Sequence, residues 1–249
     1  MASGYDLQCI TLSQDGRIYQ IEYAAKAVEN GCTVTGLICK DGVILASEKI
    51  RQSKTIVTNS NPTIYNITKT IGIAICGYLP DGRSIVAKAQ QEARSYKEYY
   101  GLEISGKILS DRLALHVQTN TIYWFNRPFG AVVMIASYDK DGPHLYMIEN
   151  DGNCLEYYSC SHGKGRQYVK NDVERNDFAI RKKNVEEARS ELLKILIKSY
   201  EGEKETEYDL SYITNNTKKH EQLKKSDLSE LVKLLKSQVE EERKMEVDN

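Results

Sequence analysis

A small nucleophilic residue stands at the start of the first β-rich run in this sequence. Cys32 and Thr33 open the run "CTVTGLICKDGVILASEK". A thiol or hydroxyl at the very beginning of a mature chain can act as a nucleophile, with its own α-amine as the base. This chemistry requires that everything before the nucleophile be cleaved away. A self-processing hydrolase that uses Cys32 or Thr33 is therefore one candidate function, and it predicts a mature chain beginning at that residue.

The segment that such cleavage would discard has the pattern of ordered structure. The stretch "LSQDGRIYQIEYA", from Leu12 to Ala24, predicts a tight turn at Asp15-Gly16 followed by a helix. Apolar residues then recur with the three-then-four spacing of one helical stripe that ends near Gly31; they are Ile18, Ile21, Ala25 and Val28. Processing at Cys32 or Thr33 would remove this helix.

The other polar motifs give little support to a metal or phosphate site. Five Asp-Gly pairs suggest calcium, but in "DKDGPHLYMIE" the glycine is the fourth residue and not the sixth, so turns explain these pairs better. The Gly-x-Gly of "SHGKGRQ" precedes a helix and is a weak signal for anion binding. The four histidines form no pair with metal-ligand spacing. We therefore expect no cofactor and no metal.

The composition is that of an ordinary folded protein. Of the 249 residues 41% are hydrophobic and 28% charged, which argues against global disorder. A net charge of -1 provides no field that would attract nucleic acid or an anionic membrane. The start of the chain lacks the basic and apolar parts of a secretory signal, and the six cysteines include no Cys-x-x-Cys pair. We therefore expect reduced thiols in the cytoplasm or nucleus.

Strands precede helices in the first half of the chain. A hairpin is predicted first and a second strand pair follows; these strands are Thr33–Cys39, Val43–Ser47, Thr63–Thr68 and Thr70–Cys76. One helix begins at Pro80-Asp81 and ends at Gly101. A second helix, with a weaker stripe from Leu109 to Trp124, ends before Arg127-Pro128.

The second half repeats the order and completes a single domain. Strands are predicted in "AVVMIASYD", "HLYMIEN", "CLEYYSCS" and "TEYDLSYIT", and helices near Lys164–Arg175, at Val185–Tyr200 and from about Ser226, before a charged tail at residues 240–249. The basic clusters Arg181-Lys182-Lys183 and Lys218-Lys219-His220 are interpreted as solvated faces. No linker interrupts residues 1–249, so we expect an α+β domain in which two antiparallel sheets lie between helix layers.

At this point the sequence resembles a known family. "GYDLQCITLSQDGRIYQIEYAAKAVENG" closely resembles the N-terminal signature of proteasome alpha subunits, and the similarity continues through "GYLPDGRSIV", "NRPFG", "HLYMIENDG" and "SHGKGRQ". The resemblance covers nearly the whole chain. It implies the four-layer αββα sandwich of the N-terminal nucleophile hydrolases, with an extra N-terminal helix at residues 18–31 after a gate tail and turn at residues 1–17.

What the resemblance implies for the N-terminal helix is architectural. In this family the helix is retained, lies across the sandwich, helps alpha subunits pack side by side and blocks the cleft that catalytic beta subunits use. The residues that match this ring-packing segment are Gly16, Arg17, Gln20 and Glu22.

The resemblance also implies that the catalytic site is degenerate. Cys32 falls at the position of the beta-subunit nucleophile, and Glu48 retains an acidic residue. Thr63 replaces the essential lysine, and Lys164 replaces the serine of a Gly-Ser-Gly motif. An acid without the amine, the lysine and the serine cannot activate a nucleophile. We therefore expect no peptidase activity from this chain.

Two further sets of residues match functional positions of the family. Tyr5, Asp6 and Tyr23 match the cluster that orders the gate tails, but Gln14 stands in place of its proline. The walls of the pocket that receives the C-terminal tails of activator ATPases correspond to Gly31 and Tyr78, and its lysine corresponds to Thr63.

The expected partners follow from this resemblance. They are six other alpha-type subunits, the beta-type subunits of the 20S core, activators such as the 19S regulatory particle, and unfolded protein in transit, without nucleic acid or membrane. The alternatives from the residues alone are the self-processing hydrolase and a free-standing binding module, for which the sequence offers no ligand-binding constellation.

Overall fold

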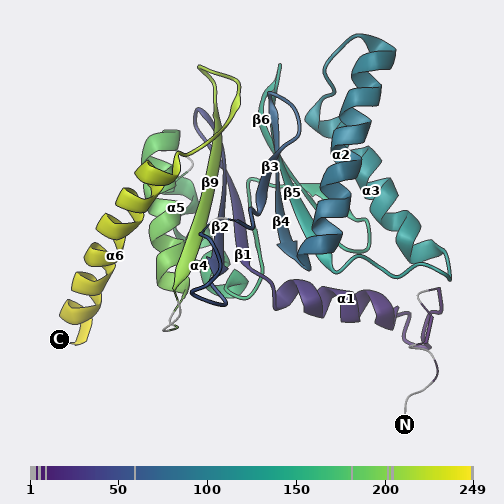
Figure 1. Ribbon diagram of the computed structural model, residues 1–249, viewed down its shortest axis with the longest axis horizontal. Helices are drawn as coiled ribbons and strands as arrows, with labels where there is room; N and C mark the ends of the chain where they lie inside the picture. Colours follow the sequence, from purple (N-terminus) through teal and green to yellow (C-terminus); the bar gives the residue numbers. More distant parts are fainter. Residues whose placement is uncertain are drawn as a thin grey trace.

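Two five-stranded antiparallel sheets face each other between two layers of helices in the computed structural model (Figure 1). The structure describes residues 4, 7–8, 10–58, 60–180, 182–200, 202 and 205–247, without the side chains of 176–180 and 242–247. This arrangement confirms the expected α+β sandwich. No helix in the described part of the chain is long and apolar enough to cross a membrane.

One sheet is built entirely from consecutive strands. In the order β3-β4-β5-β6-β7 it contains Ile64–Asn66, Ile71–Gly77, Ala131–Asp139, Gly142–Ile148 and Cys154–Glu156. Its outer face is covered by α2 (Leu79–Tyr100) and α3 (Gly106–Ile122) (Figure 1). Helix α2 ends where predicted, because Gly101 adopts the left-handed conformation (φ 70°) that terminates helices.

The other sheet combines strands from both ends of the chain. In the order β10-β9-β2-β1-β8 it contains His220–Gln222, Thr206–Thr214, Gly42–Ile50, Thr33–Cys39 and Ser159–His162. Three helices cover its outer face, and they are α4 (Arg166–Ile180), α5 (Val185–Ser199) and α6 (Lys225–Val247) (Figure 1).

The central strands β1, β2, β4 and β5 are buried over most of their length because both faces of each sheet are covered. In β2, Val43 and Leu45 pack between the sheets, whereas Ile44 and Ala46 pack against the helices of the outer layer. In β5, Met134 likewise belongs to the core between the sheets. The alternation follows from the two-residue period of a strand.

Helix α1 (Tyr19–Glu29) lies across one end of the sandwich (Figure 1). The turn before it forms as predicted: the Gly16 amide donates to the Ser13 carbonyl at 3.0 Å, and Gly16 has φ +75°. Val28, at the last turn of α1, is 2% exposed and packs into the core between the sheets.

Several predictions about individual elements were wrong. The run "CLEYYSCS" is not one strand, because β7 and β8 belong to different sheets. Helix α3 ends at Ile122, so Trp124 lies beyond it and is exposed. His220 does not belong to a solvated face, because it is buried in β10, a strand that the sequence did not predict. Helix α6 also continues to Val247, through most of the charged run expected to follow it.

Candidate functional site

A cavity of about 550 Å³ opens beside the start of β1, where the nucleophile was expected. Its lining brings together Cys32, Thr33, Glu48 and Lys164. Cys32 lies between α1 and β1, within a continuous chain, so its nitrogen belongs to a peptide bond with Gly31. The α-amine that an N-terminal nucleophile uses as its base would exist only after cleavage of this bond.

Glu48 reaches this cavity because β2 pairs with β1. The ladder places Glu48 opposite Thr33. The residue is 4% exposed, and burial raises its pKa to about 7, although hydrogen bonds from Ser199 and Thr33 act in the opposite direction. The Ser199 hydroxyl lies 3.4 Å from Oε2, and Oε1 has no hydrogen-bond partner among the described residues. Glu48 therefore has a pKa suited to a general base.

A glycine loop closes the opposite wall. Gly163 has φ +104°, and a Cβ there would lie 2.1 Å from the Cys32 carbonyl oxygen. The Gly165 amide donates to the Thr33 hydroxyl at 3.1 Å, and the Lys164 amide donates to the Gly31 carbonyl at 3.2 Å. The loop fixes the backbone at Cys32, while Lys164 is exposed and contributes no hydroxyl.

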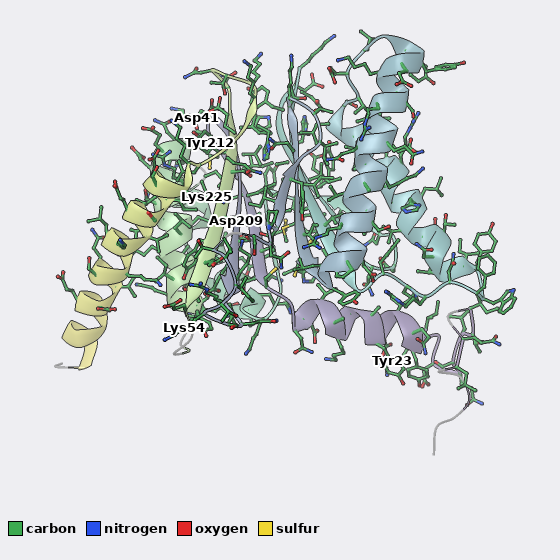
Figure 2. All side chains as sticks on the ribbon, in the orientation of Figure 1. Tyr23, Asp41, Lys54, Asp209, Tyr212 and Lys225 are labelled. Atoms are coloured by element: carbon green, nitrogen blue, oxygen red, sulfur yellow. The ribbon has the colours of Figure 1, made fainter. Side chains whose placement is uncertain are left out.

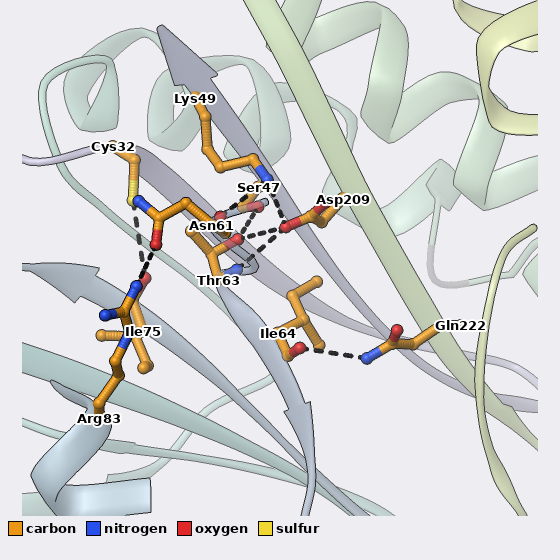
Figure 3. A network of polar contacts seen from close by, with 10 residues as sticks. All are labelled: Cys32, Ser47, Lys49, Asn61, Thr63, Ile64, Ile75, Arg83, Asp209 and Gln222. Carbon is orange, nitrogen blue, oxygen red and sulfur yellow. Dashed lines mark hydrogen bonds and ion pairs between the residues drawn. The ribbon is translucent and has the colours of Figure 1, made fainter. Parts of the chain in front are cut away.

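Thr63 belongs to a buried polar network and not to the cavity of Glu48 (Figure 3). It is 0% exposed, and its hydroxyl contacts the Ser47 hydroxyl at 2.5 Å and Asp209 Oδ2 at 2.9 Å. Lys49 Nζ donates to the same carboxylate oxygen at 2.8 Å and to the Asn61 carbonyl at 3.1 Å. Lys49 is therefore held by Asp209, on the side of the sheet away from Glu48 that alternation in β2 dictates.

A second cavity of about 470 Å³ adjoins the first. Gly31 and Thr63, predicted as walls of the activator pocket, both line it, together with Lys49, Arg51 and Lys164. Tyr78 is not among its described lining residues, although its neighbours Gly77 and Leu79 are. The structure thus brings together two of the three predicted wall residues.

The predicted gate and ring-packing residues surround the beginning of α1. Tyr5 and Asp6 lie outside the described residues. Gln14 is exposed in the turn before α1, and Tyr23, 52% exposed, lies on the helix face away from the sheets (Figure 2). Arg17 forms an ion pair with Glu22 at 2.5 Å.

Gln20, the remaining ring-packing residue, also lies on α1 and is half-buried.

Sequence reasoning missed three residues of this region. Ser199 contributes a hydroxyl to Glu48 from the end of α5, and Lys49 pairs with Asp209 from β9. Adjacent acidic and basic residues at Glu48-Lys49 were the available signal, but their partners come from distant parts of the sequence. As arranged, the cavity combines a thiol residue and an acid, Cys32 and Glu48, with the exposed Lys164.

Comparison with known proteins identifies the family. Residues 28–213 match the family model described as "Proteasome subunit", and residues 5–27 match the model of the N-terminal signature of A-type proteasome subunits. The chain is 41% identical over 235 residues to the alpha type-3 proteasome subunit of Arabidopsis thaliana, with 94% of each chain covered. It is 40% identical over 248 residues to the alpha type-3 proteasome subunit of Acanthamoeba castellanii, with 98% of each chain covered.

A third relative carries a different subtype number. The chain is 42% identical over 210 residues to the probable alpha type-7 proteasome subunit of Schizosaccharomyces pombe, with 84% of this chain and 82% of the relative covered. The matches agree on the alpha type and cover both the sandwich and the segment before it. The chain therefore belongs to the proteasome subunit family, as an alpha-type subunit of the 20S core, the type that supplies its non-catalytic subunits.

Proposed function

We propose that this chain is a structural and gating subunit of the outer ring of the 20S core. Six other alpha-type subunits complete the ring, which rests on the beta-type subunits, controls the passage of unfolded protein and receives activators such as the 19S regulatory particle. The particle works in the cytoplasm and nucleus. The single observation that carries this proposal is that α1 is a folded part of the domain and is anchored to the rest of it. A propeptide, by contrast, could be removed without loss to the domain.

Side-chain contacts hold helix α1 at both of its ends. The Asn150 side chain, in the turn after β6, donates to the Ile21 carbonyl at 2.8 Å. At the other end, Arg166 of α4 pairs with Glu29 at 2.9 Å. Val28 is buried between the sheets. Removing α1 would expose this core and take away the partners of Asn150 and Arg166, so the helix supports a scaffold and argues against processing at Cys32.

The outward face of α1 supports a role in ring packing. Tyr23 offers an aromatic side chain that the described part of the chain leaves half exposed, and aromatic residues are enriched at protein interfaces. Together with Gly16, Arg17, Gln20 and Glu22, it forms the surface through which we propose that a neighbouring alpha-type subunit docks.

The gate contribution of this subunit is proposed to be incomplete. Tyr5, Asp6 and Tyr23 supply part of the cluster that orders gate tails, but Gln14 cannot pre-set the backbone φ as proline does. The tail of this subunit therefore depends on its neighbours for the open conformation.

The activator pocket beside Thr63 is proposed to capture tail carboxylates weakly. Loss of a charge-assisted hydrogen bond costs roughly 1.5–3 kcal/mol. Threonine carries no charge, and the Thr63 hydroxyl already donates to Asp209, so it offers no donor to a tail carboxylate in the second cavity. Titrating an activator tail peptide against particles carrying Thr63→Lys checks this: unchanged affinity at this pocket would contradict the proposal.

The decisive experiment for the scaffold function is assembly. The chain is co-expressed with the other subunits of its own 20S core, and particles are analysed by native mass spectrometry. We expect full-length chain in the particle and a several-fold loss of incorporation for Tyr23→Ala. Leu234→Ala is the matched control, because Leu234 is an exposed apolar residue on α6, far from α1 (Figure 1). A chain that begins at Cys32 or Thr33 would refute the scaffold hypothesis.

A further inference from the structure

Two thiols face each other where the two sheets meet behind α1. Cys32 precedes β1 in one sheet, and Cys76 lies in β4 of the other. Their contacts are reciprocal. The Cys32 thiol lies 3.6 Å from the carbonyl of Ile75, the residue before Cys76 (Figure 3). The Cys76 thiol lies 3.2 Å from the Cys32 carbonyl oxygen and 3.7 Å from that of Val28.

The backbones beside these thiols are in direct contact. A Cβ placed on Gly31 would lie 2.6 Å from the Cα and the nitrogen of Gly77. Gly31 precedes Cys32 and Gly77 follows Cys76, so the glycines let the two chains approach more closely than ordinary sheet packing allows. A disulfide needs Cα atoms about 4.4–6.8 Å apart, and the contact between Gly31 and Gly77 brings the backbones of the adjacent cysteines close together.

The surroundings of Cys32 favour its thiolate. The neighbouring Cys76 thiol is the largest influence and lowers the pKa of Cys32, against the opposing effect of burial. The Gly77 amide and the charge of Lys49 act in the same direction as Cys76. The same contact raises the pKa of Cys76. Cys76 is fully buried, whereas Cys32 lines both cavities, so Cys32 is the member of the pair that a reagent reaches first.

The other described cysteines lack this environment. Burial raises the pKa of Cys39 and of Cys160 to about 12. Cys154 is half-buried like Cys32, yet burial raises its pKa as well. Cys32 alone among the described cysteines lines both cavities beside β1.

We propose that Cys32 and Cys76 form a redox-active dithiol that exchanges with small-molecule disulfides. The Cys32 thiolate attacks one sulfur of the small disulfide, forming a mixed disulfide and releasing one thiolate. Cys76 then loses its proton and attacks the Cys32 sulfur, which releases the second small thiol and closes the Cys32–Cys76 bond. The protein dithiol is oxidised, and one small disulfide is reduced to two thiols.

The product joins the two sheets covalently at the end of the sandwich that α1 covers. The bond connects the residue that enters β1 with the end of β4, immediately behind the buried Val28. Oxidation therefore adds a covalent bond to the part of the core against which α1 packs. Disulfide exchange is neither peptide-bond cleavage nor ring packing, so this inference goes beyond the proposed function.

Oxidation of the assembled particle tests the proposal. The purified 20S core containing this chain is incubated with oxidised glutathione, digested without reduction and analysed by peptide mass spectrometry. We expect a peptide pair joined through Cys32 and Cys76 that disappears after reduction. In Cys76→Ser, glutathione should remain on Cys32, and in Cys32→Ser, Cys76 should stay unmodified. A lasting mixed disulfide in the parent chain, or no modification of Cys32, would overturn the proposal.

Alkylation rates provide an independent control for exposure. Cys32 and Cys154 are both half-buried residues, so Cys154 is the nearest available comparison for iodoacetamide labelling at neutral pH. We expect Cys32 to label roughly tenfold faster than Cys154, and Cys39 and Cys160 to label more slowly still. Equal rates for Cys32 and Cys154 would mean that exposure alone governs the reaction and that no dithiol site exists. Neither measurement depends on how the chain contributes to the gate.

Discussion

At the scale of single residues, the Asp209 carboxylate accepts hydrogen bonds from two residues near the cavities. One of its oxygens accepts bonds from Lys49 Nζ and from both the amide and the hydroxyl of Thr63. Asp209→Ala removes the acceptor of all three donors, whereas Lys49→Met leaves the two bonds from Thr63 intact. We expect Asp209→Ala to cost about 3 kcal/mol of unfolding free energy and Lys49→Met about half of that. Urea denaturation compares them, and equal losses would contradict the network.

Glu48 makes stability depend on pH in a defined direction. Its pKa in the folded chain is about 7, above its ordinary value of 4.5, so the folded state binds more protons between these values. The stability that it contributes is therefore fully present below about pH 4.5 and is lost as the pH rises through 7. A glutamine does not titrate, so Glu48→Gln should not show this loss. Relative to the parent, its free energy of unfolding should rise by on the order of 2 kcal/mol from pH 5 to pH 8.

Thermal melting of both chains at pH 5 and pH 8 measures this effect. Glu98→Gln is a suitable comparison, since Glu98 is an exposed glutamate on α2. A Glu48→Gln variant whose melting temperature differs from the parent equally at both pH values would show that Glu48 does not titrate in this range.

The sequence could identify Cys32 because it opens a β-rich run, and the family resemblance pointed to Glu48 and Lys164. It could not identify Asp209 as the partner of Lys49, because their pairing depends on the register of β2 with β9, which sets Lys49 opposite Glu207 and Ser47 opposite Asp209. Nor could it show that Thr63 is buried with Asp209, since an isolated threonine before a short strand carries no pattern of its own.

At the scale of elements, α1 is held by a side-chain hydrogen bond from the turn that follows β6. Asn150→Ala removes the side-chain bond to the Ile21 carbonyl, which is worth about 1 kcal/mol. We expect amides in α1 to exchange hydrogen roughly fivefold faster, while those of α2 keep their rates. Asn153→Ala, an exposed asparagine in the same turn, is the control. If α1 exchanges at the same rate in both variants, the helix does not rely on Asn150.

Strands with strong patterns were predicted with accurate bounds, and weak ones were not. The segments Thr33–Cys39, Ala131–Asp139 and Thr206–Thr214 are the observed β1, β5 and β9. The run "CLEYYSCS" was misread because composition cannot show that a chain changes sheets at Tyr157-Tyr158. Strand β10 was missed because His220 looks like part of a basic cluster, although it is buried beside Gly72.

At the scale of the whole molecule, the two sheets differ in how local their pairings are. One is a meander of β3 to β7 in sequence order, while the other pairs β1 with β8 and β2 with β9. Pairings between distant segments form more slowly, because loop closure must precede them. We expect refolding followed by pulsed hydrogen exchange to protect β4 and β5 before β1 and β2. Simultaneous protection of both sheets would contradict this order.

The same topology has a consequence for synthesis on the ribosome. The hairpin of β1 and β2 emerges early, but β8 and β9, which cover its two edges, are translated only after most of the chain. During this interval the nascent hairpin carries two open, apolar edges of the kind that pair with other chains. A newly made subunit therefore spends much of its translation time with these edges open to aggregation, until the last third of the chain has left the exit tunnel.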